Sequence, residues 1–459
     1  MRTWATDTHG TLRDLQLNIE PASFSFEDKP FRVKASLQNF EDIAYAITAN
    51  GELDIARIYK VFSRKGIDVS GFIKADLSLQ GRQSDATHGR YNQLHNRGTL
   101  QVRNLQTSTE YFPRPFLIRE GLFTFRQDKM WFANFLAAYG QSDFRMDGYM
   151  QNVIDYALTD NAVLKGNFNV SANYINADEF MAFAPPKKDS QSTVITTTAA
   201  NITPADAGVI IIPANLDLTL TASAKKVAYN GMVLENAKGN LAMKQGKLSL
   251  KETGFNLIGC DVLMDADYSS TTPAKAVFDY HLQAKEFDIR KAYNEIRLFH
   301  DMATSAGKAQ GIVSLDYNLK GSLDGNMHPV YPSLQGGGVL SVKNVKVYGM
   351  KLFSAVSRQT GKDSINNPSL AKVDIKTTIK NNIITIERFK FRVAGFRPRI
   401  EGQTSFDGRL NIKMRLGLPP LGIIGIPMRI TGTQENPKVK LGKGDKEDIP
   451  ETEYKEDNN

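Results

Sequence analysis

The residue types that most often carry out catalysis or bind metals are few and scattered in this 459-residue chain. None of the six histidines lies in a zinc-ligand spacing such as H-E-x-x-H. The sequence also contains no G-x-S-x-G elbow and no phosphate loop that ends in Gly-Lys-Ser/Thr. A pair of carboxylates can still meet in space, as in glycosidases, without leaving a pattern in the sequence. We nevertheless expect no catalytic residue, no metal site and no cofactor, and therefore a protein that is not an enzyme.

The excess of basic residues raises the question of an anionic partner. The formal net charge of +8 fits either scattered, solvated cations or attraction to anionic lipid or nucleic acid. The most suggestive segment, 388–399, interleaves Phe389 and Phe391 with Lys390 and Arg392. In a strand this order places rings and cations on opposite faces, whereas the stacking of bases needs both on one surface. We therefore expect a strand with a basic outer face and no nucleic-acid partner.

An alternation of apolar and polar residues predicts the elements that hold these side chains. The alternation runs through 216–221, 313–320, 389–393 and 410–416. Because successive strand side chains point to opposite faces, each segment has one apolar and one wet face. The dipeptides Gln245-Gly246, Asn381-Asn382 and Asp407-Gly408 lie between such runs and predict hairpin loops. The fold class is therefore mainly β, with antiparallel strands.

Only a few amphipathic helices are expected. The clearest begins at Asp288, a good N-cap residue, and runs to about Ser305. Shorter helices are predicted to begin near Asp54 and near Asp178.

The sequence also repeats itself. Residues 71–81 and 311–321 share Gly, Asp, Leu and Gly in register, and Gly98 and Gly338 open the strands that follow. Duplicated units of strands plus one helix indicate elongated stacking, in which each unit buries its apolar residues against the neighbouring unit. Because few helices remain to cover the apolar face, we expect a curled sheet of repeated β-groove units with an apolar floor suited to acyl chains.

Composition divides the chain into four parts. Residues 1–183 and 214–441 are predicted to form sheet units of this kind. Residues 184–213 carry Pro-Pro, Lys-Lys and a Ser/Thr tract and are predicted to be a linker or mobile loop, and the charged residues 442–459 a disordered tail. The sequence shows neither an uninterrupted apolar run of roughly 20 residues nor a signal peptide. We therefore expect either a cytoplasmic chain or a fragment that has lost its targeting segment.

The closing segment, 425–440, is similar to the end of the AsmA domain. It has an apolar strand entry with Pro427, then Gly432-Thr433, then Pro437. The strands of 395–408 and the repeated Gly-x-Leu-x-Val openings at Gly98 and Gly338 fit the same pattern, which covers roughly residues 50–440. The resemblance implies a bacterial envelope protein on the periplasmic side of the inner membrane, normally held there by an N-terminal anchor that is absent from this chain. It also implies β-grooves like those of bridge-like lipid-transfer proteins, with phospholipid as partner.

Two functions follow from this resemblance and the apolar floor. The first is non-enzymatic binding or conduction of phospholipid between inner and outer membrane, in support of outer-membrane biogenesis. The second is a scaffold that affects outer-membrane protein assembly through contacts with envelope proteins, with a fully packed sheet whose edge strands pair with a partner. For any single floor residue, a place in a closed core is an equal alternative. The candidate floor residues are Leu100, Val102, Phe123, Phe125, Leu216, Leu218, Val313, Leu315, Ile384 and Ile386.

Overall fold

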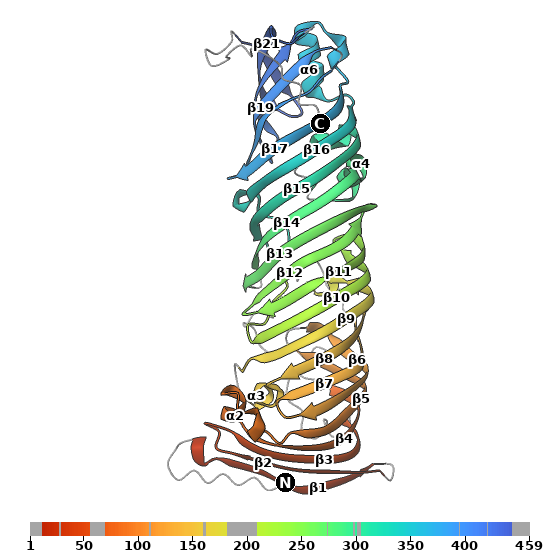
Figure 1. Ribbon diagram of the computed structural model, residues 1–459, viewed down its shortest axis with the longest axis vertical. Helices are drawn as coiled ribbons and strands as arrows, with labels where there is room; N and C mark the ends of the chain where they lie inside the picture. Colours follow the sequence, from red (N-terminus) through yellow and green to blue (C-terminus); the bar gives the residue numbers. More distant parts are fainter. Residues whose placement is uncertain are drawn as a thin grey trace, which may run out of the picture. The chain divides into compact units, whose positions relative to one another are not determined.

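The protein is mainly β, as the alternation predicts. A computed structural model describes residues 12–26, 29–55, 69–109, 112–158, 162–180, 209–272, 274–296, 299–300, 304–393, 395–419 and 421–442. The described strands form one open sheet of 22 strands accompanied by a few short helices (Figure 1). The chain divides into two compact units. The first comprises Met1–Thr253, Asp267–Ala276 and Gly325–Met327, and the second Gly254–Ala266, Val277–Asp324 and His328–Asn459.

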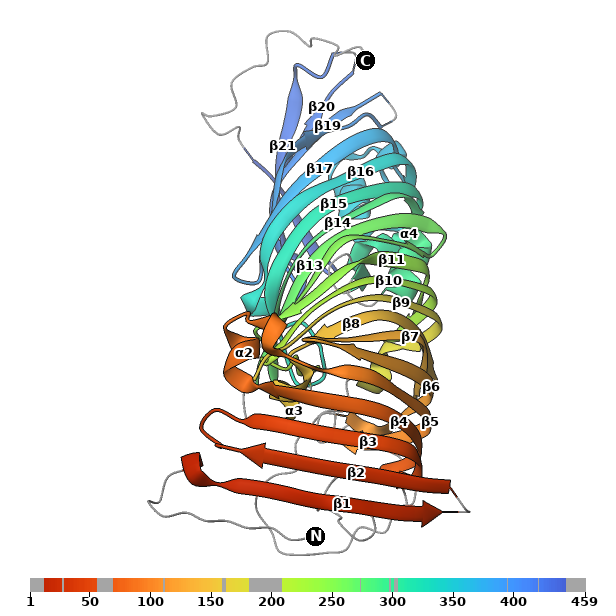
Figure 2. The same ribbon diagram turned by 60° about the horizontal axis from the view of Figure 1, so that its bottom comes forward.

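Strands of the first unit pair in chain order. They are β1 (Gln16–Phe26), β2 (Lys29–Gln38), β3 (Ala44–Asp54), β4 (Val69–Arg82), β5 (Arg97–Thr109), β6 (Phe112–Arg126), β7 (Lys129–Tyr139), β8 (Ser142–Gln151), β9 (Leu164–Asn176), β10 (Leu216–Tyr229) and β11 (Met232–Lys244). Each neighbouring pair from β1 to β9 is antiparallel, as is β10 with β11. Figure 2 shows how strongly β4 to β9 curve along their length.

One pair departs from the antiparallel pattern. Strand β10 runs parallel to β9, with Leu216 opposite Leu164. Parallel neighbours need a crossover connection, since both strands start at the same end of the sheet. The predicted linker, 184–213, falls in this connection. Its residues 184–208 lie outside the described residues, and the strands on both sides of it belong to the first unit.

Strands of the second unit form an antiparallel meander from β15 to β22. They are β15 (Ala309–Leu323), β16 (Gln335–Val347), β17 (Ser369–Lys380), β18 (Ile383–Lys390), β19 (Arg397–Ser405), β20 (Arg409–Gly417), β21 (Gly425–Thr433) and β22 (Pro437–Leu441). Strands β12 (Lys247–Leu257), β13 (Cys260–Thr272) and β14 (Lys275–Asp288) contribute residues to both units.

Short helices lie between the strands. The first unit has α2 (Gln83–Thr87), α3 (Val153–Leu158) and the 3-10 turns η1 (Leu12–Asp14), η2 (Tyr91–Gln93) and η3 (Ala177–Phe180). The second has α4 (Ile289–Glu295), α6 (Lys351–Thr360), η5 (Thr304–Lys308), η6 (Tyr331–Ser333) and η7 (Asp363–Ile365). Helix α6 has no counterpart among the sequence predictions, although Phe353 and Val356 give it a buried side.

The predicted hairpin loops are confirmed. Gln245 and Gly246 join β11 to β12 with φ of 51° and 75°, and Asn381 and Asn382 join β17 to β18 with φ of 52° and 64°. Two-residue loops with positive φ at both positions match the right-handed twist of the strands they connect. A three-residue loop that ends in Asp407-Gly408 joins β19 to β20.

The predicted helices fare unevenly. The backbone N–H groups of Arg290 and Lys291 donate to Asp288 Oδ1 at 2.8 and 2.9 Å, so Asp288 caps α4 as expected. The single helix predicted to reach Ser305 is wrong, because Ile296 is extended and ends α4 at Glu295. The start of the helix predicted near Asp178 lies in the 3-10 turn η3, and the residues after Phe180 lie outside the described residues. The helix expected after Asp54 falls on residues 56–68, outside the described residues.

The sequence repeat recurs as a structural repeat within the two units. A Cβ on Gly98 would come within 3.0 Å of the backbone of Asp76, and one on Gly338 equally close to that of Asp316. The repeated segments lie in β4 and β15. Gly98 lies in β5, which pairs with β4, and Gly338 lies 240 positions later in β16, which pairs with β15. Only glycine lets the neighbouring backbone approach this closely, so the duplicated glycines preserve the strand pairing.

Candidate functional site

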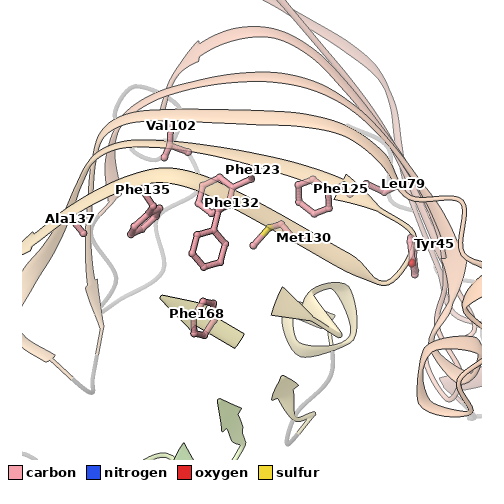
Figure 3. Packing of buried hydrophobic residues seen from close by; sticks show 10 residues of the cluster. All are labelled: Tyr45, Leu79, Val102, Phe123, Phe125, Met130, Phe132, Phe135, Ala137 and Phe168. Atoms are coloured by element: carbon pink, nitrogen blue, oxygen red, sulfur yellow. The ribbon is translucent and has the colours of Figure 1, made fainter. Parts of the chain in front are cut away.

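A cluster of buried apolar side chains lines one face of the first unit. Strands β3 to β7 and β9 contribute the members of this first apolar cluster, which are Tyr45, Leu79, Val102, Phe123, Phe125, Met130, Phe132, Phe135, Ala137 and Phe168. Figure 3 shows these side chains on the inner side of the arch that the strands form. Alternation places most of them there, because residues two apart on a strand share a face.

Aromatic rings hold the middle of this cluster together. The Phe132 ring centroid lies 5.1 Å from that of Phe168, 5.7 Å from that of Phe135 and 6.1 Å from that of Phe123. Tilted and stacked ring pairs at such separations contribute about 0.5–1.5 kcal/mol each beyond the burial of their area. The four rings come from β6, β7 and β9, so they tie three strands to one another.

A smaller cluster lies in the second unit. The second apolar cluster comprises Tyr317, Leu319, Leu334, Ile379 and Ile384, and partly buried Leu315 packs against it. Burial raises the pKa of the Tyr317 hydroxyl, whose bond to Thr377 Oγ1 acts in the opposite direction. A neutral phenol therefore stays within the cluster at physiological pH.

The predicted floor residues divide between these clusters. Val102, Phe123 and Phe125 are buried members of the first apolar cluster, and half-buried Leu100 and Leu218 pack against it. In the second unit, Ile384 is a buried member of the second apolar cluster and Leu315 packs on its edge.

The remaining three floor candidates belong to neither cluster. Val313 is 1% exposed, whereas Leu216 and Ile386 are half-buried. The predicted floor thus contains fully buried positions such as Val102, which is 2% exposed, beside half-buried ones such as Leu218 and Leu315.

Reasoning from the sequence missed the aromatic centre of the first apolar cluster. The missed residues include Met130, Phe132 and Phe135 on β7. Asn134 has φ of 52° and shifts the register between Phe132 and Phe135, so the apolar residues change phase along the strand. A bulge of this kind breaks the period of two that sequence reading relies on. Reading β7 as two short alternating runs around Asn134 would have found these side chains.

The basic segment 388–399 separates its rings from its cations. Phe391 and Val393 are buried while Lys390 and Arg392 are exposed, and the Phe389 and Phe391 rings stack at 6.0 Å. The Arg388 guanidinium donates to both carboxylate oxygens of Glu401 at 2.9 and 3.0 Å. Rings and cations therefore do not share one stacking surface here.

In the described part of the chain, no group of three or more His, Cys, Asp or Glu side chains is placed to hold a metal ion. None of the described helices has the length and apolar character needed to cross a membrane. No family model, curated protein or solved structure matches the chain.

Proposed function

We propose that the chain binds glycerophospholipid by its acyl chains and passes it along the apolar face of the open sheet. The observation that carries this proposal is the continuity of the first apolar cluster with the partly buried residues around it. Together they extend without a break from Tyr45 on β3 to Leu218 and Leu220 on β10. Eight strands at ordinary spacing span about 34 Å. The acyl chains of one leaflet fill about half of a hydrocarbon core that is roughly 30 Å thick, so the apolar face is long enough for an acyl chain.

The energetics of such binding need no catalytic group. Each acyl CH₂ removed from water contributes roughly 0.8 kcal/mol, so apolar area alone gives affinity. Half-buried side chains such as Leu100, Leu218 and Leu315 can exchange contact with water for contact with lipid. Placement between the inner and outer membranes, on the periplasmic side, is part of the proposal and rests on the resemblance to AsmA proteins.

The low exposure of the ring cluster supports a second candidate. Phe132 is 4% exposed and Val102 is 2% exposed, as in a closed core. A sealed face would suit a scaffold that supports outer-membrane protein assembly through protein contacts.

Native mass spectrometry after extraction in mild detergent separates the two candidates. Lipid binding predicts adducts with the mass of a glycerophospholipid on the intact chain. Repeated purification of lipid-free chain that retains its fold would leave the scaffold as the better account.

A further inference from the structure

A cavity adjoins the first apolar cluster within the first unit. It is small, with about 20 Å³ of space, which is room for about one water-sized group such as an ammonium. Three members of the first apolar cluster, Tyr45, Phe125 and Met130, form part of its wall, together with Val153 and Ile154 of α3. Helices α2 and α3 contact one another at this wall (Figure 2). The cavity therefore continues the proposed acyl-chain face to one of its ends.

A buried carboxylate with one unpartnered oxygen lines this cavity. Asp155 of α3 is only 8% exposed, and its Oδ1 accepts no hydrogen bond from any group in the described part of the chain. Leaving a buried charged oxygen unpaired costs more than leaving a neutral one, so native proteins normally supply a donor. A water molecule or a ligand with an N–H or O–H group would supply the missing donor.

The cations that line the cavity are engaged elsewhere. Arg82 Nη1 lies 3.3 Å from Asp42 Oδ2, in an ion pair. Lys129 Nζ lies over two rings, 4.5 Å from the Tyr149 centroid and 5.5 Å from the Trp131 centroid. The negative charge of Asp155 thus has no ion pair among the described residues, and the cavity favours a cation.

The wall of the cavity also suits a cation. Burial raises the pKa of the Tyr45 hydroxyl, and the charges of Asp85 and Asp155 raise it further, against the bond to Asn96. Tyr45 and Phe125 line the cavity, and an aromatic ring attracts a cation that lies over its face. Asn96 lines the cavity, and its Nδ2 donates to Tyr45 Oη. The corresponding position of the second repeat is Gly336, which has no side chain to make this hydrogen bond, so the Asn96–Tyr45 pair belongs to the first unit.

We propose that this cavity binds a primary ammonium group on Asp155, which rests on the proposed function because it selects the headgroup of the lipid. An ammonium with three N–H donors satisfies Oδ1 and neutralises the carboxylate, whereas a quaternary ammonium carries no N–H donor at all. The ligand class is an ethanolamine phospholipid whose acyl chains lie on the half-buried residues around the first apolar cluster. A choline phospholipid with the same chains lacks the group that Oδ1 needs.

The test compares headgroups at constant acyl chains. Short-chain phosphatidylethanolamine and phosphatidylcholine are titrated calorimetrically into the full chain, into Asp155→Asn and into Asp374→Asn. Asp374 is an exposed carboxylate on β17 and serves as the matched control. We expect the unchanged chain and Asp374→Asn to bind the ethanolamine lipid at least about tenfold more tightly than the choline lipid. A single charge-assisted hydrogen bond provides a difference of this size. Asp155→Asn loses this preference and keeps its affinity for the choline lipid, which also shows that it is folded.

A second titration with free ethanolamine and free choline distinguishes the sources of the ammonium group. Free ethanolamine that binds as tightly as the lipid identifies a small amine as the ligand. If neither lipid binds but ethanolamine binds in an Asp155-dependent manner, the lipid function fails and the ammonium site stands. Equal affinity for the two lipids, or a preference that survives in Asp155→Asn, overturns the ammonium site and leaves lipid binding intact. Absence of all binding overturns both.

Discussion

Two substitutions on one face of β15 measure how far that face is open. Val313 and Leu315 lie two residues apart, opposite Val342 and Leu340 on β16, and so share a face. Val313 is 1% exposed and Leu315 is half-buried. An aspartate at either position therefore places the same charge in two different surroundings of one strand.

The expected costs differ by several kcal/mol. At position 313 an unpaired carboxylate has no access to water, and we expect Val313→Asp to lower the free energy of unfolding by more than about 4 kcal/mol. At position 315 the carboxylate can remain wet. The loss is then mainly half of a leucine's burial, about 1–1.5 kcal/mol, and the total cost is about 1–2 kcal/mol.

Urea denaturation followed by far-ultraviolet circular dichroism measures both losses, and co-purified lipid is quantified in the same preparations. We expect Leu315→Asp to fold and to carry less lipid than the unchanged chain. Asp316→Leu, on the wet face beside His281, is the control and should leave bound lipid unchanged. If Leu315→Asp costs as much as Val313→Asp, the face at β15 is closed core, and the reasoning for a lipid-accessible floor there is refuted.

Three further substitutions test individual contacts by the same denaturation assay. Asp288→Ala should lower the free energy of unfolding by about 1 kcal/mol, because the cap of α4 is lost, and Asp288→Asn by much less; equal losses would contradict the cap. Phe132→Ala should cost about 3–5 kcal/mol through the cavity left among the rings, and a cost below about 1 kcal/mol would show that the rings do not pack as described. Hydrogen bonds from Arg388 lower the pKa of Glu401 in the folded chain. The stabilisation by ionised Glu401 is therefore complete above pH 4.5 and disappears as the pH falls through the lower folded-state pKa. Glu401→Gln should therefore reduce the loss of stability in acid by less than about 1 kcal/mol, since the pair is partly exposed, and an unchanged acid slope would argue against this ion pair.

Local sequence patterns predict much of this fold because antiparallel strands with one covered face alternate visibly. Val313, Leu315, Tyr317 and Leu319 fall on one face of β15 as expected. Turn residues with positive φ, such as Asn381 and Asn382, fix the hairpins because few other residues adopt that conformation. Both features depend on neighbouring residues alone, so one sequence is enough to read them.

What the sequence could not predict depends on long-range packing. The bulge at Asn134 moves Phe135 onto the face of Phe132, and the residues near Asn134 in the sequence do not predict this change of register. Strands β9 and β10 pair in parallel through a crossover connection, and the alternation of apolar residues does not predict the direction in which two strands pair. The surroundings of Asp155 come from β3, β6, β7 and the two short helices, so its buried and unpartnered oxygen emerges only when these elements meet.

The most direct test of the proposed function maps where an acyl chain lies. A photo-cross-linking phenylalanine analogue is placed singly at Leu100 or Leu218, on the apolar face, or at the neighbouring Thr99 or Thr219, on the wet face. The four variants are illuminated with glycerophospholipid vesicles and analysed for lipid adducts by mass spectrometry. Lipid binding along the sheet predicts adducts at positions 100 and 218 and few or none at 99 and 219. Equal labelling of both faces, or no labelling at the apolar positions of a folded chain, would contradict it.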